Sequence, residues 1–183
     1  MVQRDRQQHR SILKSIFSFP ETINEYAART VAGFIAIMAL AYLQSHNIYL
    51  LAFMIYGFLA RVVAGPSLSP IALLVTKIII PQMGNPYAEC PGPPKRFAQL
   101  VGLIFTSSSF YFIINGELIA GYLLIGVLAL FASLESIMGF CAGCWFFKQM
   151  MKWGWIPQKV CKKCNDIYLI VNTKEQIVDG WRK

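Results

Sequence analysis

The sequence predicts an all-α integral membrane protein: a helical bundle of four transmembrane helices in two antiparallel hairpins, with a short interfacial helix and a small cytoplasmic tail. Three observations support this fold class. Of the 183 residues, 56% are hydrophobic and 14% are charged, and the mean hydropathy of +0.49 is too high for a soluble chain of this size. Four segments are long enough to cross a hydrocarbon core of about 30 Å, or nearly so. All 17 Lys and Arg residues fall on one side of those segments.

Residues 1–24 precede the first span and form a basic segment. Over residues 1–18, apolar side chains recur at helical spacing among four basic ones, which predicts an amphipathic segment on the cytoplasmic membrane surface. We do not expect a cleaved signal peptide, because the apolar run begins late and lacks a clear cleavage signal.

The membrane domain is expected over residues 25–144 and opens with spans at about 27–43 and 48–63. Spanning a bilayer takes roughly 17 to 25 residues, so both spans are short, and their terminal arginines should extend toward the interface. A polar turn of four residues, 44–47, joins them into the first hairpin.

The next two segments are too short or too irregular to span. Residues 71–80 are apolar but only ten residues long, which predicts an interfacial or re-entrant helix. Residues 81–96 contain five prolines and two glycines, which predicts a stiff loop without regular structure.

The second hairpin consists of spans at about 97–115 and 118–140, joined by a turn at 115–117. A basic tail, 145–183, follows and carries a second Cys-x-x-Cys pair. Neither this turn nor the one at 44–47 contains Lys or Arg, whereas every other connection does. Basic residues accumulate on the cytoplasmic side, so both termini are expected there, at the inner (cell) membrane. The same distribution explains the net charge of +8 without a nucleic-acid partner.

Cys141 and Cys144 stand where the fourth span should leave the membrane, and we interpret them as a redox pair. If Gly139 ends the span and a new helix begins near Cys141, the helix N-terminus would stabilise a thiolate there. If the helix continues through Gly143, that activation disappears. A third reading makes the pair two buried thiols that pack as small apolar side chains.

Cys161 and Cys164 lie in a lysine-rich part of the tail, where a thiolate is favoured, and we interpret them as a relay pair. Sixteen residues separate Cys144 from Cys161, a gap that is also typical of a zinc site with four cysteine ligands. Zinc held by Cys141, Cys144, Cys161 and Cys164 is therefore the alternative; otherwise no cofactor is predicted. Cys90 is a lone thiol in the proline-rich loop. It could resolve a disulfide at Cys141, but with no companion an incidental cysteine is the favoured interpretation.

Glu135 is a carboxylate inside the fourth span, where a charge is costly and is usually paired. Arg61, near the inner end of the second span, is the expected partner, in an ion pair that links the two hairpins. Together with Lys95 and Arg96, Arg61 would also form a cationic mouth for a sulfur oxyanion or a lipid headgroup.

Three blocks of the sequence resemble a bacterial membrane-protein family catalogued as domain of unknown function 4395. They are Arg61 with the following GPSLSP, GPPKRFAQ from Gly92 to Gln99 with Gly102, and Leu134-Glu135 with the following GFCAGC that ends at Cys144. The resemblance covers roughly residues 24–157. It implies that the Cys-x-Gly-Cys unit after the last span is a hallmark, and that relatives accompany thioredoxin-like and sulfurtransferase proteins.

These observations favour a membrane-bound thiol/disulfide or persulfide redox protein, with Cys141 and Cys144 as the reactive pair. Cys161 and Cys164 would pass the disulfide or sulfur to a cytoplasmic thioredoxin-like or sulfurtransferase partner. The alternative is a non-catalytic membrane scaffold with the four-cysteine zinc site.

Overall fold

The computed structural model describes residues 22–155, and these residues are mostly helical. Four helical stretches among them are long and apolar enough to cross a membrane. They are α2 (Glu25–Ser45), the stretch that begins with α3 (Ile48–Ala64), α6 (Gly92–Ile114) and α7 (Leu118–Met138). The predicted all-α chain with four long apolar helices is therefore confirmed, and these helices are those of a multi-pass membrane protein.

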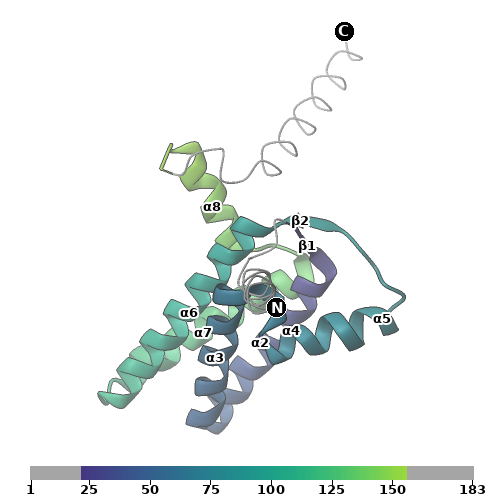
Figure 1. The fold of residues 1–183 in the computed structure, drawn as a ribbon. Helices are drawn as coiled ribbons and strands as arrows, with labels where there is room; N and C mark the ends of the chain where they lie inside the picture. Colours follow the sequence, from purple (N-terminus) through teal and green to yellow (C-terminus); the bar gives the residue numbers. More distant parts are fainter. Residues whose placement is uncertain (1–21, 156–183) are drawn as a thin grey trace, which may run out of the picture.

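The long helices pack side by side with their connections at two opposite ends (Figure 1). The α2–α3 and α6–α7 connections lie at one end, and the strands and α8 (Ala142–Lys152) lie at the other. The most extensive contact joins α2 to α7, and α6 packs against both α3 and α7. Helices that are adjacent in sequence are thus not always the closest neighbours in space.

Asparagine side chains begin two of the long helices. Asn24 accepts a hydrogen bond from the Tyr26 amide at 3.1 Å, and Asn47 accepts one from the Tyr49 amide at 3.0 Å. Each satisfies an N–H group that has no partner within its helix. His46 ends α2 in the left-handed conformation, with φ of 53°, so the polar turn expected at 44–47 is two residues long.

Small side chains allow the helices to approach closely. Ala36 and Ala39 of α2 are buried in the main core, as are Ala129 and Ala132 of α7. Where α3 crosses α6, a Cβ on Gly102 would lie 2.3 Å from the Phe58 ring, so this contact requires glycine. In membrane proteins such close packing takes over the role that the hydrophobic effect has in water.

The segment predicted as one helix over 71–80 is helical but divided. It consists of α4 (Pro70–Leu74), the π-helical turn η2 (Val75–Ile79) and α5 (Ile80–Gln82), and it leaves the bundle sideways (Figure 1). Pro81 explains the wide turn, because it has no N–H to donate and its ring would clash with the carbonyl four residues earlier. Ile71, Val75 and Ile80 are nevertheless buried in the main core.

The prediction of an irregular loop over 81–96 is wrong at both ends. Its first two residues belong to α5. Glu89–Pro91 forms a strand, β2, which pairs antiparallel with β1 (Thr22–Asn24), and α6 begins at Gly92 rather than at residue 97. Prolines 93 and 94 occupy the first turn of α6, where the missing N–H costs no helical hydrogen bond and the fixed φ favours the helix. Lys95 and Arg96 consequently belong to a helix and not to a loop.

The fourth long helix ends at Met138, two residues before its predicted end, and Trp145 to Lys152 belong to α8. Residues 1–21 and 156–183 lie outside the described part of the chain. The predictions for the amphipathic N-terminal segment and for Cys161 and Cys164 therefore remain predictions.

Candidate functional site

Gly139 separates α7 from α8 and decides the position of the Cys141–Cys144 pair. Its φ of 71° is a left-handed conformation, and its N–H donates to the Glu135 carbonyl at 3.0 Å, which closes the last turn of α7. A new helix, α8, begins at Ala142 with Cys141 as its N-cap residue. Of the geometries that the sequence left open, the one with Cys141 at a helix N-terminus is the one found.

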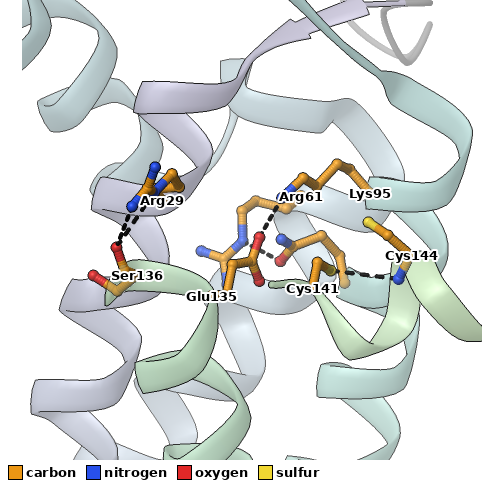
Figure 2. A network of polar contacts seen from close by, with 8 residues as sticks. Arg29, Arg61, Lys95, Glu135, Ser136, Cys141 and Cys144 are labelled. Carbon is orange, nitrogen blue, oxygen red and sulfur yellow. Dashed lines mark hydrogen bonds and ion pairs between the residues drawn. The ribbon is translucent and has the colours of Figure 1, made fainter. Parts of the chain in front are cut away.

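The two thiols of the pair interact directly. The Cys144 amide donates to the Cys141 sulfur at 3.4 Å, so the sulfur caps α8 in the way that an oxygen usually does (Figure 2). A hydrogen bond from the Cys144 side chain is the main cause that lowers the pKa of Cys141, and the nearby Lys95 ammonium also lowers it, whereas burial raises it. The same bond raises the pKa of Cys144, as burial does. Of the two thiols, Cys141 is therefore the one that loses its proton more easily, and Cys144 is the one that donates to it.

Helix α8 is held against the start of α6 by a close contact. A Cβ on Gly143 would lie 2.6 Å from the Cβ of Ala98, so only glycine permits this approach. The Phe97 ring stacks on Phe146 with centroids 6.4 Å apart and tilts against Phe147 at 5.7 Å. This packing brings the N-terminus of α8 beside the first turn of α6, which carries Lys95.

Lys95 forms an ion pair with Glu135, and both side chains are largely buried (Figure 2). The expectation that Glu135 pairs with Arg61 is wrong. Because α6 begins at Gly92, Lys95 lies in the first turn of a helix that packs on α7. This position brings its ammonium group, and not the Arg61 guanidinium, into contact with the Glu135 carboxylate. The charge near the C-terminal end of α7 is thus neutralised by a lysine that the sequence analysis expects in a loop.

Arg61 takes a different role at the junction of α3, α6 and the segment before α4. Its Nε donates to Oε1 of Gln99 at 2.7 Å and its Nη1 donates to Oγ of Ser69 at 3.1 Å, while the guanidinium lies 4.6 Å from the centroid of the Phe58 ring. Gln99 and Ser69 were not singled out from the sequence as site residues. Both stand in the motif blocks that carry the family resemblance, which was the available signal.

The other two arginines of this region bind backbone carbonyls. Arg96 Nε donates to the Val62 carbonyl at 2.9 Å, which ties α6 to the end of α3. Arg29, which the sequence singled out only as a charge at the start of a span, donates to the Ile137 carbonyl at 2.8 Å and to the Ser136 carbonyl at 3.4 Å (Figure 2). A cation that binds the last carbonyls of α7 also complements the helix dipole.

Cys90 lies closer to the pair than the sequence suggested. It lines a cavity of about 330 Å³ together with Lys95, Cys141, Cys144 and Lys148. The pairing of Cys90 with Ile23 in the two-stranded sheet holds it at this position. Burial raises the pKa of Cys90, so among the three described thiols Cys141 is the one poised to be ionised.

The zinc alternative depends on residues beyond 155. Among residues 22–155, no group of three or more His, Cys, Asp or Glu side chains is arranged to hold a metal ion. Cys141 and Cys144 supply two thiols, and Cys161 and Cys164 lie outside the described residues, so the four-ligand site is untested.

Comparison with known proteins identifies one family. The family model described as "Domain of unknown function (DUF4395)" matches residues 23–152, which include every site residue discussed above except the tail cysteines. No curated protein and no solved structure matches the chain.

Proposed function

The chain belongs to this family, domain of unknown function 4395, and from that premise we propose that it is a membrane-bound thiol/disulfide or persulfide redox protein with Cys141 and Cys144 as its reactive pair. One observation carries the proposal: Cys141 caps the N-terminus of α8 and accepts a hydrogen bond from Cys144 beside an open cavity. A thiolate is the nucleophile in disulfide exchange, and a helix N-terminus and a nearby cation both stabilise it.

The exchange follows from the order of the two thiols. The Cys141 thiolate attacks one sulfur of a partner disulfide, a mixed disulfide forms, and the other partner sulfur leaves as a thiolate. Cys144 then gives its proton to that first leaving thiolate, the resulting Cys144 thiolate attacks the Cys141 sulfur, and the second partner sulfur leaves as a thiolate. The partner disulfide is reduced to a dithiol while Cys141 and Cys144 are oxidised to a disulfide.

A persulfide donor would react at the same sulfur. The Cys141 thiolate attacks the outer sulfur of the donor, a persulfide forms on Cys141, and the donor leaves as a thiolate. Cys90 lines the same cavity and is therefore a third thiol able to compete with Cys144 for an oxidised or persulfidated Cys141.

The proposal includes an orientation. The two hairpins would cross the inner membrane with both termini in the cytoplasm, so that the cavity faces the reducing compartment. The distribution of basic residues supports this, since the connections at 46–47 and 115–117 contain none. Cys161 and Cys164 would relay to a cytoplasmic thioredoxin-like or sulfurtransferase partner. A reporter fused after Asn115 should locate that residue on the outer side of the membrane, and one fused after Lys152 should locate that residue in the cytoplasm. The reverse result would refute the orientation.

Thiol mass-tagging combined with metal analysis tests the chemistry. After mild oxidation of the purified protein, we expect a reversible Cys141–Cys144 disulfide and no stoichiometric zinc. A Cys90→Ser variant is the control, because it should still form that disulfide. A Cys90→Ser/Cys144→Ser variant has no thiol left in the cavity to attack Cys141, so it should instead trap a mixed disulfide between Cys141 and an added small-molecule disulfide. Stoichiometric zinc, with thiols that react only after chelation, would refute the redox proposal and establish the scaffold alternative.

A further inference from the structure

Arg61 carries a guanidinium nitrogen whose hydrogen-bonding capacity is not used. The residue is 4% exposed, and Nε and Nη1 have partners, but among the described residues Nη2 has none. Leaving a buried donor without a partner destabilises a folded protein, and more strongly when the donor is charged. Such a group in a packed protein requires an explanation, and a ligand is one of the common ones.

A second cavity adjoins this side chain and is separate from the thiol cavity. Its volume is about 200 Å³, and its walls are largely apolar, with Ala28, Val31 and Pro66 among them. The charged side chains that line it, among the described residues, are Arg61 and Lys95, and both are cations. Glu135, the carboxylate paired with Lys95, does not line it. Glu135 also acts electrostatically on Arg61, so two cations and one carboxylate leave a net positive charge beside the cavity. The setting is of low polarity, where charge–charge attraction is strong.

The donors beside the cavity are of the kinds that bind an anion. Gln99 accepts from Arg61 through Oε1, which leaves its amide nitrogen as a donor. Lys95 has three N–H groups and uses one on Glu135. Together with Nη2 of Arg61 these groups can bind several oxygens of one ligand, and guanidinium groups bind oxyanions preferentially in this way.

We propose that the cavity beside Arg61 is a binding site for a compact oxyanion, which Nη2 of Arg61 binds together with the free donors of Gln99 and Lys95. The oxyanion is either a free inorganic ion of the sulfate or phosphate type or the phosphate group of a lipid. The site needs neither Cys141 nor Cys144, so it stands independently of the redox proposal. Lys95 lines both cavities, however, and a bound anion would be adjacent to the thiol site.

Calorimetric titration of the full chain in a maltoside detergent without phosphate tests the proposal, with sodium sulfate and sodium phosphate as probes. We expect one site in the wild type and in a Cys141→Ser/Cys144→Ser variant. Ala28→Leu should fill the cavity without disturbing the bonds of Arg61, and Arg61→Gln should remove the charge. Each should weaken binding by at least about tenfold, the equivalent of about 1.4 kcal/mol, which is below the usual strength of a hydrogen bond to a charged group.

Ala41→Leu is the matched control, because Ala41 is exposed on the same helix and does not line the cavity; it should bind as the wild type does. The lipid source is tested by adding phosphatidic acid or diacylglycerol to the micelles. If phosphatidic acid competes with sulfate and diacylglycerol does not, the ligand is a lipid phosphate. If neither lipid competes with sulfate, the ligand is the free ion. Absence of binding of every probe to the wild type, or unchanged binding in Ala28→Leu, would overturn the proposal.

Discussion

The hydrogen bond from the Cys144 side chain to the Cys141 sulfur should have a measurable effect on the pKa of Cys141. Replacing Cys144 with alanine removes the side-chain donor, which is the largest influence that lowers the pKa of Cys141, and leaves the backbone amide at 3.4 Å in place. A hydrogen bond to a charged group contributes about 1.5–3 kcal/mol, and one pKa unit corresponds to about 1.36 kcal/mol. We therefore expect the pKa of the Cys141 thiol to rise by about 1–2 units in Cys144→Ala.

Cys144→Ser is the matched variant, because its hydroxyl still donates and cannot form a disulfide. The assay is the rate of alkylation of Cys141 by iodoacetamide as a function of pH, in a background where the other three cysteines are serine. Alkylation rises with pH as the thiolate forms, so at a pH below both pKa values the alanine variant should react about 10–100-fold more slowly than the serine variant. Equal pKa values in the two variants would refute the assignment of Cys144 as the donor.

Two further predictions concern the surroundings of the pair. A Cβ on Gly143 would lie 2.7 Å from the backbone of α6, so Gly143→Ala should lower the free energy of unfolding by about 1–3 kcal/mol. Gly126→Ala is the control and should not lower it, because there is open space around Gly126. Thermal unfolding in detergent measures both variants. Lys95 lowers the pKa of Cys141 and Glu135 raises it. We therefore expect Lys95→Gln to shift the alkylation profile of Cys141 to higher pH and Glu135→Gln to shift it to lower pH. Shifts of the same sign in both variants would contradict this electrostatic account.

The elements with the longest apolar runs were predictable, and those that depend on proline were not. The helix of Glu25–Ser45 was expected at 27–43 and the helix of Leu118–Met138 at 118–140, because their patterns are continuous. The five prolines between 81 and 96 predict a loop, yet two of them lie in the first turn of α6. Proline has opposite effects at the first turn and in the interior of a helix, and composition does not tell these positions apart.

Within the site, the residue types were predictable and their partners were not. Cys141, Glu135 and Arg61 were each recognised because thiol pairs and intramembrane charges are rare. Which charges form an ion pair depends on helix rotation and on where each helix begins. Helix α6 begins five residues earlier than predicted, so Lys95 is helical and pairs with Glu135 in place of Arg61. Cys90 lines the thiol cavity because β2, which contains it, pairs with β1. Each of these strands has three residues, which is too short to be recognised from a sequence pattern.

The amino-acid sequence alone predicts the membrane character and the number of long apolar helices, because both follow from summed hydropathy along continuous segments. It also determined that two thiols stand three residues apart after the last of them. Only the tertiary structure decided that the helix breaks at Gly139, so that Cys141 lies at an N-terminus and not at a C-terminus. That difference depends on one backbone conformation, which the contact of α8 with α6 and the left-handed φ of a single glycine establish together.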